Sequence, residues 1–165
     1  MNKYQQIAKR IVTASRVLDV GCGAGDLGRS LNGKQCKLTG WDLKLDRVNA
    51  NREAYQLLEE HDIEKQGFGS EKYDVIVFSD VLEHLNDPEK VLEKSRESLS
   101  SGGMLLVSLP NVAYLDNRIG LLKGNWNYTG EGILDRTHLK FFTLFTAEQL
   151  LVSTGYRIQE IDPEI

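Results

Sequence analysis

The segment Val17-Leu18-Asp19-Val20-Gly21-Cys22-Gly23-Ala24-Gly25-Asp26-Leu27-Gly28 joins a short apolar run, a glycine-rich loop and the start of a helical pattern. The apolar, β-branched residues before the loop are typical of an interior strand in a parallel sheet. The alternating glycines leave bare backbone on one side of the turn, so a ligand can approach it closely. The following helix would present its free N–H groups at the same place. The segment therefore predicts a strand, loop and helix that bind a ligand.

The charges beside the loop narrow the choice of ligand. The pattern Gly23-x-Gly25-x-x-Gly28 satisfies the dinucleotide fingerprint, which is a weak signal by itself. Asp19 ends the strand and Asp26 opens the helix. A pyrophosphate would meet these two carboxylates where anion binding requires N–H groups. A ligand with an ammonium and a sulfonium would find them favourable, and S-adenosylmethionine (SAM) is such a ligand.

The composition is that of an ordinary globular domain. The chain has 165 residues, of which 41% are apolar and 27% charged, and a formal net charge of −4. This length predicts one domain over residues 1–165. The negative charge and the lack of a long Lys/Arg block argue against a nucleic-acid partner. Because the N-terminus lacks a secretory apolar segment and no run approaches ~20 apolar residues, we expect a cytoplasmic protein without a membrane span.

Strand-like and helical patterns alternate along the chain. Apolar runs occupy residues 17–20, 36–42, 73–80 and 104–109, and helical patterns occupy residues 4–12, 26–31, 44–55 and 87–101, the last closed by the pair Gly102-Gly103. A capping-box pattern at residues 146–149 opens a final helix, and residues 156–162 alternate like a further strand. This order predicts an α/β fold with a doubly wound, mostly parallel sheet and helices on both faces.

Polar residues follow several of the expected strands. Asp42 lies 17 residues after Gly25, the distance that one helix and one strand require, and its carboxylate can accept both ribose hydroxyls of a nucleoside. Leu43 adjoins it, and Ser79 and Asp80 end the clearest strand. Ligands of open α/β sheets bind at the carboxyl ends of the strands, so these residues predict one cofactor edge.

These motifs resemble those of class I SAM-dependent methyltransferases of the small, single-domain type. The run from Leu18 to Gly25 resembles their first motif. The segment Phe78-Ser79-Asp80-Val81-Leu82-Glu83-His84-Leu85, followed by Asp87-Pro88, is similar to quinone-biosynthesis O-methyltransferases. Residues 125–143 resemble bacterial methyltransferases encoded with cell-surface polysaccharide genes. The resemblance implies methyl transfer from SAM, with S-adenosylhomocysteine (SAH) as product, to a small-molecule, sugar or lipid-linked acceptor, with oxygen favoured as the methylated atom.

The resemblance also implies further cofactor contacts. Residues 56–63 look helical by propensity, whereas the methyltransferase layout requires a short third strand that ends near residues 61–63. Asp62 would then accept from the adenine amine, and Ile63 would lie against the ring. The candidate cofactor-binding residues are Asp19, Gly21, Cys22, Gly23, Gly25, Asp42, Leu43, Asp62, Ile63, Ser79 and Asp80, with Asp19 near the ammonium of SAM.

A glycine-rich, aromatic insertion over residues 112–145 breaks the alternation, and it is expected to cover the substrate. A base is required only if the acceptor must lose a proton, and His138 and His84 are the candidates. Asp80, Glu83 and His84 are of metal-ligand type, but such a cluster is frequently plain solvated charge, so no metal is expected.

Two alternatives remain from other classes. One is a non-catalytic SAM-binding protein or sensor. The other is an NAD(P)-linked oxidoreductase, for which 165 residues leave no room for a second nucleotide-binding half. The related sheet normally has seven strands, but only Pro163, Glu164 and Ile165 follow residue 162. We therefore expect six strands without the last antiparallel one, and an open edge that could pair with a second copy.

Overall fold

The computed structural model describes residues 2–162, with only the backbone of residues 49 and 50. In this range a parallel sheet has the strand order β3-β2-β1-β4-β5. The strands are β1 (Arg16–Val20), β2 (Lys37–Asp42), β3 (Leu57–Glu60), β4 (Tyr73–Ser79) and β5 (Leu99–Ser108). The helices are α1 (Lys3–Arg10), α2 (Asp26–Ser30), α3 (Ile63–Gln66), α4 (Pro88–Ser98), α5 (Leu115–Leu122) and α6 (Leu144–Ser153), with 3₁₀ turns η1 (Asn49–Ala54) and η2 (Leu82–His84). This is the predicted doubly wound α/β fold.

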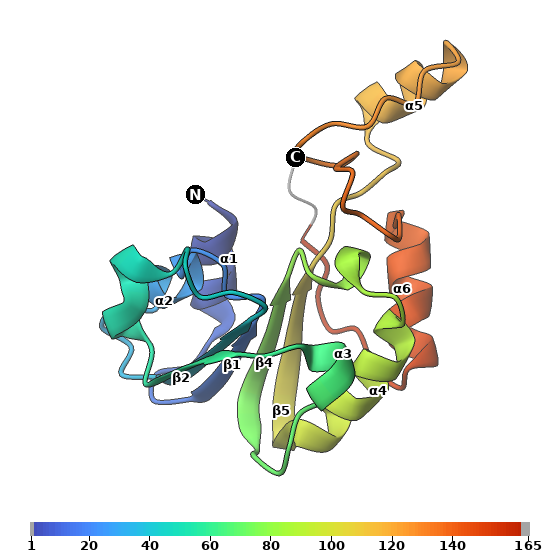
Figure 1. The fold of residues 1–165 in the computed structure, drawn as a ribbon. Coiled ribbons are helices and arrows are strands. Elements are labelled where there is room, and N and C mark those ends of the chain that lie inside the picture. Colours follow the sequence, from blue (N-terminus) through green and yellow to red (C-terminus); the bar gives the residue numbers. More distant parts are fainter. Residues whose placement is uncertain (1, 163–165) are drawn as a thin grey trace.

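The helices form two layers on opposite faces of the sheet. Figure 1 shows α1 and α2 on one face and α3, α4 and α6 on the other. Because successive strand residues point to opposite faces, Val17 belongs to the α1/α2 core and Leu18 to the α4/α6 core. Both side chains are fully buried, and each such burial contributes about 1.5–3 kcal/mol. The uninterrupted apolar runs of the central strands thus serve two cores at once.

The winding reverses beside β1. Its neighbours are β2 on one side and β4 on the other, with Val20 opposite both Trp41 and Phe78. The segments that follow these three strands therefore emerge side by side at one edge of the sheet. This reversal is the topological switch point at which open α/β sheets bind ligands.

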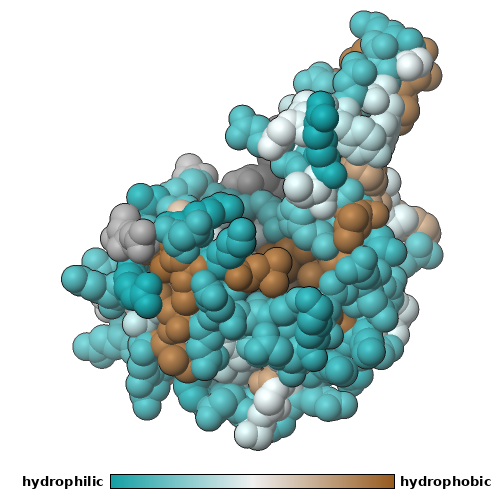
Figure 2. Space-filling model, viewed as in Figure 1, coloured by the Kyte–Doolittle hydropathy of each residue, from teal (hydrophilic) through white to brown (hydrophobic). Residues whose placement is uncertain are grey.

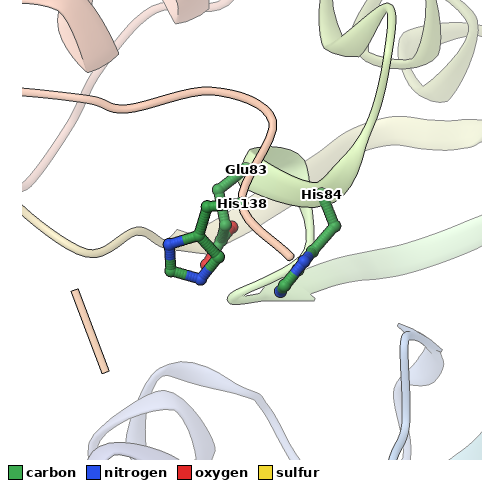
Figure 3. A group of neighbouring side chains, drawn as sticks. All are labelled: Glu83, His84 and His138. Atoms are coloured by element: carbon green, nitrogen blue, oxygen red, sulfur yellow. The ribbon is translucent and has the colours of Figure 1, made fainter. Parts of the chain in front are cut away.

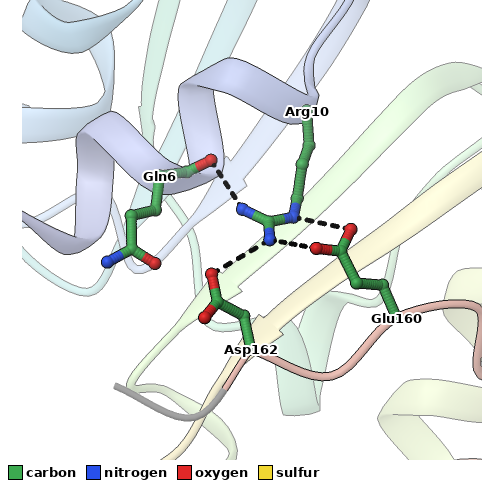
Figure 4. Close-up of polar contacts among 4 residues, drawn as sticks. All are labelled: Gln6, Arg10, Glu160 and Asp162. Carbon is green, nitrogen blue, oxygen red and sulfur yellow. Dashed lines mark hydrogen bonds and ion pairs between the residues drawn. The ribbon is translucent and has the colours of Figure 1, made fainter. Parts of the chain in front are cut away.

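The strand expected over residues 156–162 is not formed. This segment has no strand structure, although its burial alternates at residues 156–159. The described residues hold no strand on the free side of β5 that could pair with it, and alternation without a backbone partner does not make a ladder. The segment instead runs to α1, where the Arg10 guanidinium donates to the carboxylates of Glu160 and Asp162 and to the carbonyl of Gln6 (Figure 4). The tail at residues 163–165 lies outside the described residues.

Three local expectations are also corrected. Helix α4 begins at Pro88 with Asp87 as its N-cap, as predicted, but it ends at Ser98, and Gly102-Gly103 lie inside β5. The N-cap of α6 is Thr143, three residues before the expected position, because Thr143 and Thr146 bond each other's backbone and side chain. Residues 44–55 form only the short turn η1 rather than a full helix.

The insertion after β5 stands off the body. Figure 1 shows α5 projecting beyond the sheet, and Figure 2 shows apolar surface along this arm. No residue of α5 is buried, and Leu115, Leu121 and Leu122 are among its exposed side chains. None of the helices in the described part is long and apolar enough to cross a membrane.

Candidate active site

The glycine loop after β1 uses its amides within the protein. The N–H groups of Gly21 and Cys22 donate to the carbonyl of Trp41, at 2.7 and 3.0 Å, and Gly25 donates to the carbonyl of Cys22 at 2.8 Å. The Gly23 N–H donates to Oδ2 of Asp42 at 2.8 Å. These four loop amides are therefore not free to bind a ligand. Because they already have acceptors, the loop is poorly suited to a pyrophosphate, which agrees with the choice of a cationic ligand.

Gly21 cannot be replaced without moving the neighbouring strand end. Its φ is +71°, a backbone conformation that residues other than glycine rarely adopt, and a Cβ there would lie 2.5 Å from Cγ2 of Val81. The loop after β1 is therefore packed directly against the segment after β4. The absence of a side chain is what brings these two segments into contact.

Asp19 lies beneath the loop, buried at the end of β1. Its Oδ2 accepts the hydroxyl of Tyr55 at 2.7 Å. Burial raises the pKa of Asp19 to about 7, and the charge of Asp42 adds to this effect, whereas the bond from Tyr55 opposes it. A carboxylate that is costly to ionise favours a cation beside it. Its contact with the SAM ammonium stays a prediction.

Asp42 ends β2 and supports the loop from the side. One carboxylate oxygen accepts from Gly23, and the other accepts from the amide of Lys44 at 3.2 Å. Each oxygen of an ionised carboxylate has a second acceptor site, so two ribose hydroxyls remain possible donors. Leu43 follows with 68% of its surface exposed. Cys22 is buried in the loop, and burial raises the pKa of its thiol to about 12, so the thiol is unreactive, and its contact with the cofactor stays a prediction.

The end of β4 is held by the N-terminal helix. Asp80 has a φ of +55° and pairs with Lys3 of α1. Its Oδ1 also accepts the hydroxyl of Ser108 at 2.7 Å. Although burial opposes it, the bond to Asp80 raises the pKa of Lys3. Ser79 is buried, and its hydroxyl lies 3.3 Å from that of Ser108. A cofactor that contacts Asp80 would therefore lie next to α1.

The third strand forms as the methyltransferase layout requires, but Asp62 has a local role as well. β3 ends at Glu60, and Asp62 is the N-cap of α3, with its side chain accepting from the Lys65 amide. The hydrogen bond and ion pair with Lys65 lower the pKa of Asp62. Ile63 is buried in the α4/α6 core. Contacts of Asp62 and Ile63 with adenine stay predictions.

The two candidate bases meet at η2, together with a buried carboxyl group. The rings of His84 and His138 lie edge to face with centroids 4.8 Å apart. Glu83 beside them is fully buried, and its two oxygens have no hydrogen-bond partner in the described part of the chain. Burial raises the pKa of Glu83 to about 7. Figure 3 shows the two rings and the carboxyl group converging from η2 and the insertion.

Three contributors to this edge were not assigned a part in the site from the sequence. Tyr55 holds Asp19 from 36 residues away, and Lys3 holds Asp80 from 77 residues away. For Glu83 the sequence indicated only a residue of metal-ligand type. Neither Tyr55 nor Lys3 belongs to a motif, so no local signal could have found them. Burial of Glu83 could have been suspected, because its carboxyl group directly follows the apolar residues Val81 and Leu82.

The edge as a whole fits SAM. The glycine loop offers close approach, buried Asp19 favours a cation, and Asp42 ends the neighbouring strand, where its contact with a ribose stays a prediction. Asp62 and Ile63 continue the same edge at the end of β3. Fold and edge together define a Rossmann-like protein of the SAM-dependent methyltransferase class, whose members use SAM as methyl donor.

Comparison with known proteins specifies the family. The chain belongs to the methyltransferase-domain family, whose profile matches residues 1–161. A ubiquinone biosynthesis O-methyltransferase from Glaesserella parasuis is 32% identical over 107 residues, which cover 58% of this chain and 45% of that protein. The chain spans about half the length of the curated relatives that it matches first.

Solved structures have the same fold. A SAM-dependent methyltransferase from Thermotoga maritima, described as a possible histamine N-methyltransferase, has a TM-score of 0.70 at 17% identity. That alignment covers 94% of this chain and 70% of the other. Coclaurine N-methyltransferase bound to N-methylheliamine and SAH has a TM-score of 0.54 at 27% identity, over 63% of this chain and 33% of the other.

Proposed function

We propose that this chain transfers a methyl group from SAM to a hydroxyl of a small-molecule, sugar or lipid-linked acceptor, and that it does so in the cytoplasm. The observation that carries the proposal is the pair of histidines, His84 in η2 after β4 and His138 in the insertion, whose rings lie together. The first residues after that strand touch the glycine loop through Val81 and Gly21. In this proposal a histidine therefore serves as proton acceptor close to the methyl donor. The O-methyltransferase name of the Glaesserella parasuis relative supports oxygen as the acceptor atom.

Methyl transfer from SAM requires mainly that the protein align the acceptor with the methyl group. SAM, when bound, supplies a methyl group on a sulfonium, which is already a good leaving group. Alignment of acceptor and methyl can supply roughly 7–11 kcal/mol of the barrier. In this proposal Asp19, Asp42 and the glycine loop hold the cofactor, and the insertion over residues 112–145 covers the acceptor. His138 or His84 accepts the hydroxyl proton.

A single set of measurements tests this function. We expect calorimetry to detect binding of SAM and SAH but not of NAD. We expect turnover with a member of a panel of quinols, sugars and other alcohols. His138→Ala should then lower turnover far more than SAM affinity. Binding of NAD without SAM would contradict the proposal, and SAM binding without turnover on any acceptor would favour a SAM sensor.

The open sheet edge suggests a further partner. β5 is the end strand of the described sheet, and its residues are half-buried or exposed. In this proposal a second copy pairs with this edge, because unpaired backbone groups invite another strand. Sedimentation at micromolar concentration would show the dimer.

A further inference from the structure

The carboxyl group of Glu83 is the most unusual polar group at the edge. It is fully buried in η2, and neither oxygen has a hydrogen-bond partner among the described residues. Buried polar side chains nearly always have partners, so an exception requires an explanation. The backbone of Glu83 is well satisfied by contrast, since its carbonyl accepts the amides of Leu139 and Lys140 at 2.8 and 3.0 Å. These two bonds dock the insertion onto η2 and fix His138, the preceding residue.

The hydrogen bonds of the two histidines determine what faces Glu83. Nδ1 of His84 lies 3.2 Å from the carbonyl of Thr137, and Nδ1 of His138 lies 3.1 Å from the carbonyl of Ile133. A carbonyl can only accept, so each Nδ1 carries a hydrogen. Nε2 of each neutral ring is then left with a lone pair. One nitrogen from each ring and one oxygen of Glu83 all lie within 4.8 Å of one another (Figure 3). Three side chains that can accept a proton thus converge. No hydrogen bond joins Glu83 to either ring in the described part of the chain, so its carboxylate acts on them through its charge.

We propose that Glu83 and His138 work as a pair that takes up the proton released by the acceptor hydroxyl, with Glu83 as a positioning residue that raises the basicity of His138. This inference rests on the proposed function. The O–H bond of the acceptor breaks, its electron pair stays on oxygen, and the proton bonds to Nε2 of His138. The resulting imidazolium faces the ionised carboxylate of Glu83. His138 is half-buried and His84 is exposed, so His84 lies on the solvent side of the pair.

Burial and the surrounding charges together set the pKa of Glu83, and with it the pH at which the pair works. Asp80 and Lys3 act on Glu83, the first raising and the second lowering its pKa, and burial is the larger influence. Hydrogen bonds from Thr137 lower the pKa of Asp135 in the insertion, and the charges of His138 and His84 add to this effect. With its pKa at about 7, Glu83 is ionised above neutral pH, and only then can its charge act on His138. Turnover should therefore rise as pH increases through about 7.

The test uses the three histidines of the chain as probes. Their pKa values are measured by NMR titration of the imidazole ring in the wild-type chain and in Glu83→Gln. We expect the His138 pKa to fall in the variant, because a carboxylate within ~4–6 Å favours imidazolium. His61, which stacks on Trp41 and bonds the carbonyl of Gly67, should be unchanged. Glu89→Gln on the exposed face of α4 is the matched control.

Kinetics provide the second measurement. Glu83→Gln should lower kcat by roughly 10- to 100-fold, as expected when a general base is weakened, while KM for SAM stays the same. The rising limb of its pH–rate profile should move to lower pH. If Glu83→Gln does not fold, His138→Gln takes its place, and the pKa of the Glu83 carboxyl, followed by ¹³C NMR, should then rise.

Specific results would overturn the pair. One is a His138 pKa that is identical in wild type and Glu83→Gln. Another is a response to EDTA: if EDTA changed both the His138 pKa and the activity, and a divalent cation restored both, the three acceptors would hold a metal ion. The ring titration needs no acceptor, so it decides the pair even if the proposed function fails. Turnover with unaltered ring titration would leave that function standing without the pair.

Discussion

At the scale of single residues, Asp42 connects the fold to the expected cofactor. Its two oxygens already accept from the backbone of the loop and of Lys44, and each keeps a second acceptor site for the ribose contact that we predict. Asp42→Ala should therefore weaken SAM binding by ~1–3 kcal/mol, the effect of leaving hydrogen-bond partners of a charged acceptor unsatisfied. Calorimetry with SAM measures the loss. Asp42→Asn, which retains one acceptor oxygen, should lose less, and equal affinity in the wild-type chain and the alanine variant would remove Asp42 from the ribose site.

At the scale of elements, α2 packs against Tyr55, and Tyr55 in turn donates a hydrogen bond to the buried carboxyl group of Asp19. A Cβ on Gly28 would lie 2.6 Å from Cε2 of Tyr55. Gly28→Ala should therefore lower the free energy of unfolding by ~1–3 kcal/mol through overpacking, and it should weaken SAM binding because Tyr55 supports Asp19. Gly120→Ala is the matched control, since it is also helical and its Cβ would meet only the Asn125 carbonyl, at 3.6 Å. Urea denaturation should show the control unchanged or slightly more stable. Equal losses in both variants would contradict this account.

At the scale of the whole molecule, two buried carboxyl groups couple stability to pH. Burial raises the pKa values of Asp19 and Glu83 to about 7, whereas unfolded Asp and Glu titrate near ~4. Between these values the native state binds more protons than the unfolded state. This contribution to stability is therefore complete below about pH 4 and is lost as pH rises through 7. Asp74 works in the opposite direction at lower pH, because Arg16 holds its pKa at about 2.

A single substitution isolates the part of Asp19. Asp19→Asn removes the charge that is costly to bury and keeps an oxygen that can accept from Tyr55. Relative to the wild-type chain, its free energy of unfolding should rise by ~1–3 kcal/mol between pH 4 and pH 8. Urea denaturation at several pH values measures the difference. A difference that does not depend on pH would mean that Asp19 is ionised in the folded chain without a penalty. The same variant should bind SAM more weakly if the carboxylate faces the ammonium.

Local patterns determined much of the fold and part of the site. The apolar runs specify the central strands because both faces of the sheet are covered, and the glycine spacing specifies the turn after β1. Asp42 and Asp80 could be placed at one edge because parallel strands bring their carboxyl ends together. These conclusions need only local sequence patterns and the rule that parallel strands place their carboxyl ends at one edge of the sheet.

Only the tertiary structure decided the rest. The strand expected at residues 156–162 has the right pattern, but it lacks a neighbour, because strand formation depends on backbone partners supplied by other segments. The bond between Tyr55 and Asp19, the pairing of Lys3 with Asp80, and the meeting of Glu83 with His138 join residues 36, 77 and 55 positions apart. Such contacts arise from how helices and loops pack, and that packing cannot be inferred from the periodicity of the sequence. The sequence by itself therefore predicted a cofactor-binding edge, and the packing of distant segments decided which other side chains lie along it.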